Sequence, residues 1–271
     1  MSVERHYAAA GSVVDAVRAA LVAAGKDMAR LRNDDLAAVS EFHIRGRKAT
    51  LELAARMELR PGCHVLDIGS GLGGPARTLA EVYGSRVTGV DLTLAYCEAA
   101  TAMAQWVGLA DKVRFVQGDA TRLGFAPGSF DAAMTIHVAM NIAAKDAVYA
   151  SARRALKPGG IFAVYDVLQG EGGPVLFPVP WAREPSISHL ASPAQMRELL
   201  AAAGFKIEQE IDSTDESAAW FSNKAAGMAK PGATPLGFGI LLGDEYPRMA
   251  RNQVQNLAER RIRTVSYICR A

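Results

Sequence analysis

The sequence has little cysteine and no long hydrophobic run. Three cysteines occur in 271 residues, and Cys63, Cys97 and Cys269 lie far apart without a C-x-x-C pair. Neither a disulfide framework nor a zinc site is therefore predicted. No apolar stretch approaches the length of about 18 residues that a membrane span needs. The first residues carry charges of both signs instead of the apolar core of a secretory signal, so we expect a cytoplasmic protein without membrane insertion.

An excess of charge of either sign is also lacking. Lys and Arg number 30, Asp and Glu 28, and the formal net charge is +2. This balance argues against a nucleic-acid partner. Apolar residues make up 50% of the chain and charged residues 21%, which predicts a folded chain with a sizeable core. A small-molecule partner is the expectation, and a homodimer is left open.

Short apolar runs alternate with helical patterns through the middle of the chain. This alternation is typical of a parallel sheet with helices on both faces. Strands are predicted at about 64–68, 86–91, 113–117, 131–136, 160–167, 206–212 and 262–269. Helices are predicted from Pro75 to Gly84, from Thr93 onward with Leu94, Cys97, Thr101 and Ala104 on one face, and at about 143–156 and 193–203. Lys157–Gly160 is predicted as a turn.

Three segments interrupt the alternation. Residues 1–60 suggest helices at about 12–24 and 45–58 with a polar break at 32–35, and we predict a helical N-terminal cap there. The remaining residues, 61–271, are predicted to form the core. It carries lid insertions at about 168–191 and 213–261, the latter with helices at about 215–229 and 244–260.

A glycine-rich turn follows the first predicted strand. Gly69-x-Gly71-x-x-Gly74 has the spacing of the dinucleotide fingerprint, so a nicotinamide-dependent oxidoreductase is one interpretation, and a tight turn without ligand is another. Asp67, two residues before Gly69, favours a third. A carboxylate there would repel a pyrophosphate but would suit a ligand that carries an ammonium group.

Two further strand ends fit the same ligand. Asp91 ends the second strand, where it can accept hydrogen bonds from ribose hydroxyls, although NAD-binding proteins share this feature. Asp119 and Ala120 follow the third strand and could bind an adenine through a carboxylate and a backbone N–H. An ammonium, a ribose and an adenine without phosphate describe S-adenosylmethionine.

Several motifs occur together and in order. They are Asp67-x-Gly69-x-Gly71-x-Gly73, Asp91, Gly118-Asp119-Ala120, Phe130-Asp131 and Leu156-Lys-Pro-Gly-Gly160. Over about residues 60–167 the sequence resembles the class I S-adenosylmethionine-dependent methyltransferases. The resemblance implies a Rossmann-like seven-stranded sheet with six parallel strands and the last, at about 262–269, antiparallel. Glu41-Phe-His43-Ile-Arg-Gly46 and the insertions are similar to the small-molecule branch, which includes sarcosine/dimethylglycine, phosphoethanolamine and tocopherol-type methyltransferases.

The resemblance also implies roles for individual residues. Gly69, Gly71 and Gly73 would contact the methionine portion of the cofactor, with Asp67 near its amino group. Asp91 would bind the ribose, Asp119 and Ala120 the adenine, and Leu92 would also contact the cofactor. Ile136 and His137 would lie near the sulfonium, and His43 and Gly46 would add contacts from before the first strand.

The reaction expected from the resemblance is methyl transfer to a nitrogen, oxygen or carbon of a small acceptor, giving S-adenosylhomocysteine. Such a displacement needs alignment and exclusion of water, and a base only if the acceptor arrives protonated. His137 is the candidate base, with Tyr7 as its partner by resemblance to the phosphoethanolamine branch. The other interpretation is that His137 only makes a hydrogen bond near the pocket. We expect no metal.

The variable segments leave further alternatives open. Their aromatic residues could hold a methylated ammonium or a flat ring, or could simply form a hydrophobic core. These residues are Tyr7, Phe177, Trp181, Trp220, Phe221 and Phe238. Asn141 is interpreted as a helix cap, with a role in the site as the alternative. His189 could reach the substrate or be a surface residue of its loop. Asn252 and Asn256 are interpreted as helix surface. A non-catalytic protein that binds S-adenosylmethionine also remains an alternative.

Overall fold

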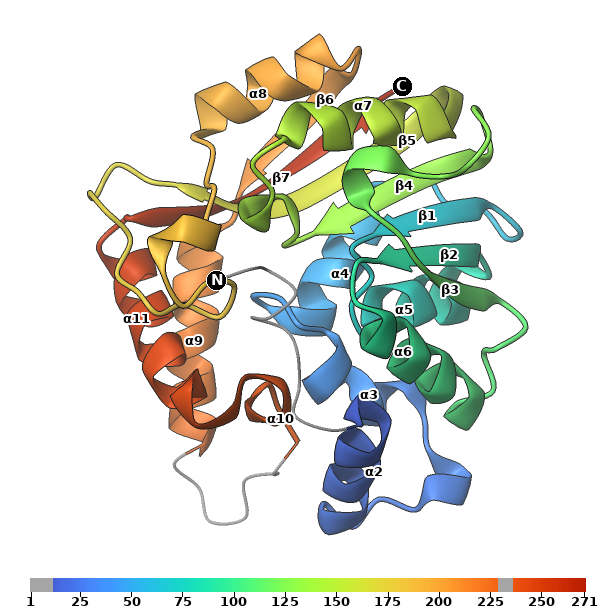
Figure 1. Ribbon diagram of the computed structural model, residues 1–271, viewed down its shortest axis with the longest axis vertical. Coiled ribbons are helices and arrows are strands. Elements are labelled where there is room, and N and C mark those ends of the chain that lie inside the picture. Colours follow the sequence, from blue (N-terminus) through green and yellow to red (C-terminus); the bar gives the residue numbers. More distant parts are fainter. Residues whose placement is uncertain (1–11, 229–235) are drawn as a thin grey trace.

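The computed structural model describes residues 12–228 and 236–271, and side chains are described outside 223–228. These residues form a seven-stranded sheet in the order β3-β2-β1-β4-β5-β7-β6 (Figure 1). Strand β7 pairs antiparallel with β5 and β6, whereas the other pairs are parallel. The predicted Rossmann-like sheet with one antiparallel strand is confirmed. The strands are β1 (His64–Ile68), β2 (Arg86–Asp91), β3 (Val113–Gln117), β4 (Phe130–Ile136), β5 (Leu156–Gln169), β6 (Lys206–Asp212) and β7 (Ile262–Arg270).

Strand β5 begins earlier than predicted. The turn expected at 157–160 is wrong, because these residues continue the strand. The extra length is taken up by an irregularity in the pairing with β4, which shifts between Phe130 and Ala132. Gly159 lies in the left-handed region with φ 77°, and its N–H donates to the carbonyl of Ala271. The turn residues therefore form a bulge instead of a chain reversal.

Helices cover both faces of the sheet (Figure 1). On one face, α7 (Lys145–Ala155) and α8 (Pro193–Ala202) share a core with Leu66 and Ile68 of β1. On the other, α4 (Gly46–Ala54), α5 (Gly74–Tyr83) and α6 (Leu94–Trp106) pack on Val65. Alternate residues of β1 thus enter opposite cores, as the period of a strand requires.

The limits predicted for α5 are close to those observed, whereas the inner face predicted for α6 is partly wrong. Gly84 ends α5 in the left-handed conformation with φ 66°. In α6, Leu94 is 51% exposed, while Tyr96 and Met103 are buried. The reason is that α6 contacts two neighbours, the sheet and α2 (Val13–Ala23), so that two of its sides are covered.

The polar segment at 32–35 begins a helix and does not break one. Helix α3 runs over Asn33–Ser40, and the Asp35 carboxylate accepts a hydrogen bond from the Arg32 N–H at 2.9 Å. The prediction missed this cap because its residues are also typical of loops. Buried Arg77 of α5 then holds α3, since its Nε donates to Asn33 Oδ1 at 3.1 Å.

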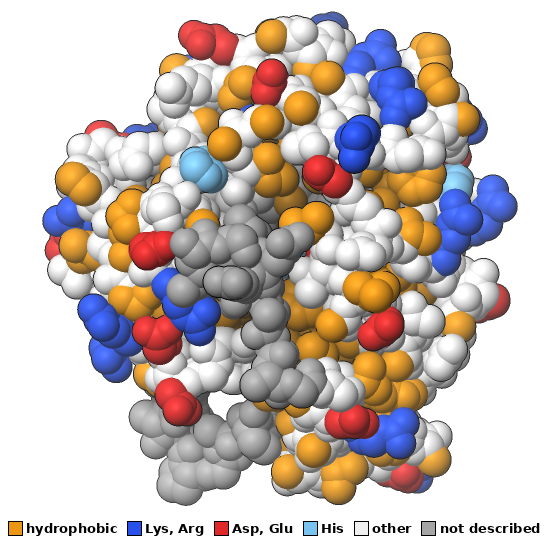
Figure 2. Space-filling model, in the orientation of Figure 1, with side chains coloured by type: hydrophobic (Ala, Val, Ile, Leu, Met, Phe, Trp, Pro, Cys, Tyr) orange, Lys and Arg blue, Asp and Glu red, His pale blue; other side chains and the backbone are white. Residues whose placement is uncertain are grey.

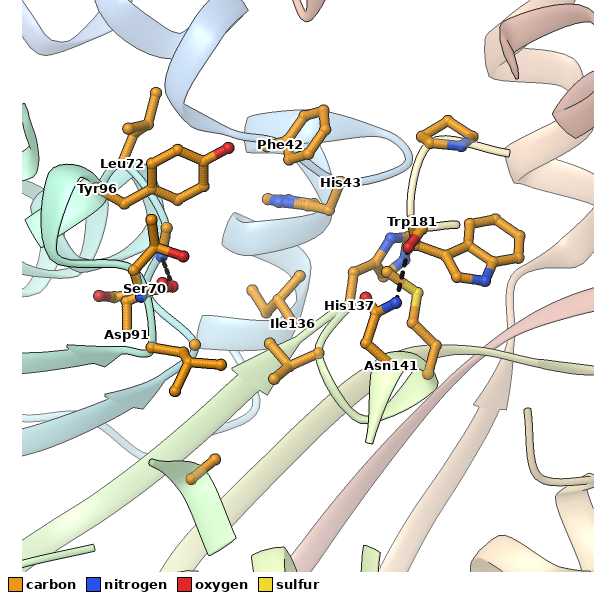
Figure 3. Close-up of a pocket in the computed structure, with 18 of the residues that line it drawn as sticks. Phe42, His43, Ser70, Leu72, Asp91, Tyr96, Ile136, His137, Asn141 and Trp181 are labelled. Atoms are coloured by element: carbon orange, nitrogen blue, oxygen red, sulfur yellow. Dashed lines mark hydrogen bonds between the residues drawn. The ribbon is translucent and has the colours of Figure 1, made fainter. Parts of the chain in front are cut away.

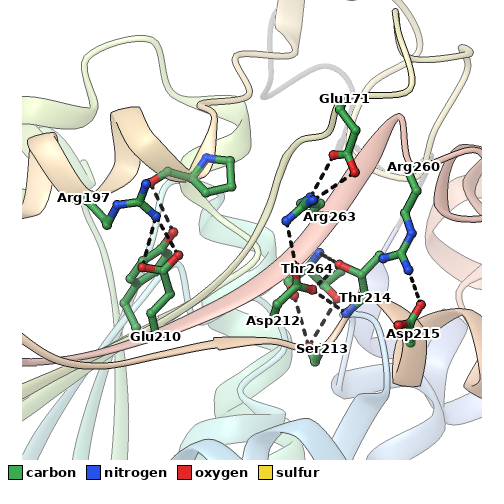
Figure 4. Close-up of polar contacts among 12 residues, drawn as sticks. Glu171, Arg197, Glu210, Asp212, Ser213, Thr214, Asp215, Arg260, Arg263 and Thr264 are labelled. Carbon is green, nitrogen blue, oxygen red and sulfur yellow. Dashed lines mark hydrogen bonds and ion pairs between the residues drawn. The ribbon is translucent and has the colours of Figure 1, made fainter.

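The segment between β6 and β7 begins at the edge of the sheet where the parallel strands end. It contains α9 (Thr214–Met228), α10 (Gly239–Leu242) and α11 (Tyr246–Ala258). The Asp212 carboxylate accepts from the Thr214 N–H at 2.9 Å, and the Thr214 hydroxyl accepts from the Thr264 N–H at 3.1 Å (Figure 4). Arg263 joins Asp212 to Glu171. These contacts fix the start of α9 beside the carboxyl edge of the sheet.

Short 3-10 helices complete the fold. They are η1 (Met28–Arg30), η2 (Ala120–Arg122), η3 (Ala139–Asn141), η4 (Pro185–Ile187) and η5 (Gly243–Glu245). Cys63, Cys97 and Cys269 are all free thiols. Within 12–228 and 236–271, every helix is too short or too polar to cross a lipid bilayer.

Candidate cofactor and acceptor site

A cavity of about 480 Å³ opens at the carboxyl edge of the sheet. Residues at the ends of β1, β2, β3 and β4 line it, together with the segment before α4 and side chains of α9 and α11. Hydrophobic side chains border the central hollow of the face drawn in Figure 2. Of the candidate site residues, the cavity lining includes His43, Asp67, Gly69, Gly71, Asp91, Leu92, Asp119, Ala120, Ile136 and His137.

Steric constraints explain why glycine occupies two positions of the turn after β1. Gly69 has φ 75°, and a Cβ there would lie 2.3 Å from a methyl carbon of Val138. Gly73 has φ 72°, and a Cβ there would lie 2.4 Å from the Phe115 ring. Only glycine fits at these two positions. Gly73 does not line the cavity; it precedes the first residue of α5 and lets the chain enter the helix.

Asp91 fixes this turn from the neighbouring strand. Its Oδ2 accepts a hydrogen bond from the Gly71 N–H at 2.8 Å, and its Oδ1 accepts from the Thr93 N–H at 2.9 Å. Burial raises the pKa of Asp91, and these hydrogen bonds oppose the rise. Each oxygen keeps a lone pair for a ligand hydroxyl.

Asp67 brings a buried carboxyl group to the site. It is 2% exposed, and its buried Oδ2 has no hydrogen-bond partner among the described residues. Burial, followed by the charges of Glu41 and Asp91, raises its pKa to about 8. A cationic group in the cavity would supply the missing partner, so the residue fits the ammonium of an amino-acid ligand.

A turn after β3 contributes Asp119 and Ala120 to the cavity lining. Asp119 Oδ1 accepts from the Thr121 N–H and hydroxyl, both at 2.8 Å, which leaves Oδ2 for a ligand. These hydrogen bonds lower the pKa of Asp119, so the carboxylate is charged. Gln117 donates from Nε2 to the Leu92 carbonyl at 3.0 Å and does not line the cavity.

The segment before α4 is held by a buried carboxylate that the sequence did not reveal. Glu41 is 2% exposed and accepts from the hydroxyls of Thr50 and Thr78, both at 2.7 Å. His43 Nε2 lies 2.9 Å from the Gly46 carbonyl and 3.7 Å from Glu41 Oε2. Gly46 does not line the cavity. Its carbonyl oxygen holds the His43 ring in place.

His137 follows the end of β4 and lines the cavity (Figure 3). Its backbone lies in the left-handed region with φ 54°, and its backbone N–H donates to the Tyr165 carbonyl at 2.8 Å. The centroids of the His137 and Tyr165 rings are 4.8 Å apart. Burial, and then His43, lowers the pKa of His137 well below its usual value, so the imidazole is neutral. Its Nε2 is buried without a partner in the described structure. Tyr7 lies outside the described residues.

The far end of the cavity is mostly aromatic and apolar. The rings of Phe42 and Phe238 are 4.6 Å apart, and Phe238 and Tyr246 are 6.0 Å apart. Trp181, Trp220 and Phe221 also line this end. Phe177 instead packs in the neighbouring hydrophobic core.

Two asparagine interpretations are corrected by the structure. Asn141 is no helix cap: its Nδ2 donates to the Trp181 carbonyl at 2.7 Å and to the Ile187 carbonyl at 2.9 Å, which anchors the loop over the cavity (Figure 3). Asn256 is fully buried and bonds Leu176 through both its amide nitrogen and its oxygen. Single asparagines carry no sequence signal for such long-range contacts. His189 does not line the cavity.

The described residues contain no group of three or more His, Cys, Asp or Glu side chains that could hold a metal ion.

Comparison with known proteins agrees with this geometry. Residues 66–164 match the family model described as a methyltransferase domain. A sterol 24-C-methyltransferase of Gibberella zeae is 42% identical over 116 residues, which span 43% of this chain and 30% of that protein. The chain thus matches less than a third of the length of this relative.

Solved structures share the fold over a larger part of the chain. Phosphoethanolamine N-methyltransferase 2 of Haemonchus contortus, bound to S-adenosylmethionine, gives a TM-score of 0.73 at 21% identity and covers 96% of this chain and 60% of that one. The [4+2]-cyclase SpnF gives a TM-score of 0.68 at 25% identity, and the match covers 96% of this chain and 94% of that one. The strand order, the glycine turn and the family match agree: residues 66–164 match a methyltransferase domain, and the sheet around them has the fold of the S-adenosylmethionine-dependent methyltransferases.

Proposed function

We propose that the protein transfers the methyl group of S-adenosylmethionine to a small-molecule acceptor bound in the apolar end of the cavity. The observation that carries the proposal is the placement of Asp67, Asp91 and Asp119 along one wall of a cavity whose other end is aromatic. An ammonium, a ribose and an adenine would meet one carboxylate each. A pyrophosphate would meet the Asp67 carboxyl group, which disfavours a nicotinamide cofactor.

The residues present fit this cofactor. Asp67 would bind the amino group, Asp91 the ribose hydroxyls and Asp119 the adenine, while Gly69 and Gly71 let the methionine portion approach the backbone. The cofactor supplies an activated methyl group on a positively charged sulfur. The chain's own task is to orient the acceptor and to exclude water.

His137 is the candidate base or orienting group. The neutral imidazole, with its unpartnered buried Nε2, can accept a hydrogen bond or a proton from an acceptor hydroxyl or amine. The part assigned to Tyr7 rests on resemblance alone.

We also propose the division into a cap at 1–60 and a core at 61–271 with two lid insertions. Support comes from the cavity lining, to which the cap contributes His43 and Ile44 and the two insertions contribute Trp181 and Trp220. A homodimer and a cytoplasmic location stay predictions, which light scattering and cell fractionation would test.

The direct test of the activity is an assay with isotopically labelled S-adenosylmethionine and a panel of amine, phenol, quinone and isoprenoid acceptors. Label in an acceptor, with equal release of S-adenosylhomocysteine, supports the proposal. Acceptors that bind beside the cofactor but receive no label would contradict it and favour a non-catalytic or cyclase-like role. Asp91→Asn is the background control.

A further inference from the structure

Helix α11 presents three amide side chains to the interior, and one of them differs from the others. Asn252 Nδ2 donates to the Pro178 carbonyl at 2.9 Å. Asn256 donates to the Leu176 carbonyl at 3.0 Å and accepts from the Leu176 N–H at 2.8 Å. Both tie the loop after β5 to the helix. Gln253, between them, makes no hydrogen bond with any part of the chain that the structure describes, although it is 5% exposed.

The Gln253 side chain lines the cavity. The amide atoms of Gln253 are not among the fully buried polar atoms that lack a partner, so they meet the accessible space of the cavity. A ligand that fills this space would displace water from the amide and would have to replace its hydrogen bonds. A structural amide would instead resemble Asn256, with both ends bonded.

The surroundings of Gln253 restrict the chemistry of the partner. Its neighbours on α9 and α11 in the cavity lining are Trp220, Phe221 and Tyr246, none of which is charged near pH 7. The carboxylates of the lining, Asp67, Asp91 and Asp119, lie at the strand ends. Among the described residues of the lining there is no Lys or Arg to balance a phosphate.

We propose that Gln253 determines acceptor specificity by binding a neutral oxygen function, a hydroxyl or a carbonyl, on an otherwise apolar acceptor. An amide can donate to such an oxygen and can accept from a hydroxyl. Among the described residues that line this part of the cavity, none would balance a phosphate or an ammonium, so a charged acceptor group would bear the cost of losing its hydration there. The inference rests on the proposed function, since it concerns the acceptor of that site.

The test measures binding to protein saturated with S-adenosylhomocysteine, so that no turnover is needed. Two matched sets of probes are used, and each contains an alcohol, a hydrocarbon, an amine and a phosphate. The first set is geraniol, myrcene, geranylamine and geranyl phosphate. The second set is 1-naphthalenemethanol with the corresponding hydrocarbon, amine and phosphate ester. The variants are Gln253→Leu, Gln253→Glu and, as a matched control, Gln255→Leu. Gln255 lies on the exposed side of the same helix and donates to Glu259.

The native protein should bind the alcohol of at least one set more tightly than its hydrocarbon, amine and phosphate. Gln253→Leu should weaken alcohol binding about tenfold, as expected for one neutral hydrogen bond, and should leave the hydrocarbon unaffected. Gln253→Glu should shift the preference toward the amine, and Gln255→Leu should change nothing.

Tighter binding of the phosphate or the amine by the native protein would overturn the inference. So would an alcohol preference that survives in Gln253→Leu, or the absence of alcohol binding in both sets. Failure of S-adenosylhomocysteine to bind would instead overturn the proposed function, so the two failures are distinguishable.

Discussion

The Asp91 carboxylate accepts a hydrogen bond from the backbone N–H of Gly71 at 2.8 Å, so the end of β2 fixes the turn that follows β1. One side chain therefore shapes the glycine turn and also faces the position assigned to the ribose. Because of this double role, replacement of Asp91 should affect both the ligand contacts and the shape of the turn.

Replacement of Asp91 by alanine should weaken S-adenosylhomocysteine binding by about 100-fold, because both the ligand contacts and the support of the turn are lost. Calorimetry measures the effect. Asp111→Ala, an exposed aspartate before β3, is the matched control and should bind as the native protein does. Unchanged affinity in Asp91→Ala would refute the ribose assignment.

Asp67 predicts an unusual pH dependence of stability. Its pKa is about 8 in the folded, ligand-free chain, whereas an unfolded aspartate has a pKa of about 3.9. The native state thus holds a proton that the unfolded state releases, so stability is fully present below about pH 4 and is lost as the pH rises toward 8. Glu41 and Asp91 add to this loss by repulsion.

Asp67→Asn should remove the loss of folding stability that the native chain shows as the pH rises from about 4 to 8. At pH 8 the ligand-free variant should be more stable than the native chain by at least about 1 kcal/mol, and the difference should disappear near pH 4. Urea unfolding at several pH values measures both. Equal stability at pH 8 would show that Asp67 is not strained by burial. The variant should also bind S-adenosylhomocysteine less tightly.

His137→Ala should lower turnover by about 100-fold or more and leave S-adenosylhomocysteine affinity within about threefold, if the imidazole acts on a protonated acceptor. Because its pKa lies well below 6.5, protonation of His137 should not reduce the rate between pH 8 and 6.5. His189→Ala, outside the cavity, is the control. Turnover that survives in His137→Ala would contradict the role as a base and leave the interpretation that His137 only makes a hydrogen bond near the pocket.

Gly69→Ala should abolish cofactor binding, because a Cβ would lie 2.3 Å from Val138 in a backbone conformation with φ 75°. The cost of the left-handed conformation alone is about 1 kcal/mol. Gly124→Ala, where a Cβ would meet nothing within 4 Å, should behave as the native protein. Thermal unfolding with and without S-adenosylhomocysteine separates lost binding from lost stability; normal binding in Gly69→Ala would contradict the described turn.

The parts of the fold that follow from local pattern could be predicted from the sequence. Strands β1, β2 and β3 have the predicted bounds because apolar runs end there at Gly, Asp or Gln. Helix α3 could not be predicted, because its start depends on Asp35, a residue equally common in loops. The bulge of β5 depends on pairing with β4 and with the last residues of the chain, which no local pattern shows.

The candidate site also contains residues that the sequence could locate and residues that it could not. The glycine turn, Asp67 and Asp91 belong to a motif with fixed spacing, so sequence could locate them. Glu41 and Asn141 act through contacts between segments far apart in the chain, and Gln253 lines a cavity that several such segments form. The sequence neighbours of these residues give no indication of burial. Tertiary structure alone reveals that Gln253 lines the cavity without a hydrogen bond to the described part of the chain, whereas Asn256 is buried and bonded to Leu176.

The most direct test of the central claim is calorimetry of the purified protein with S-adenosylhomocysteine and, in parallel, NADH. We predict binding of S-adenosylhomocysteine with a Kd in the micromolar range and no heat from NADH. Binding of NADH without S-adenosylhomocysteine would contradict the assignment of Asp67, and with it the proposed reaction.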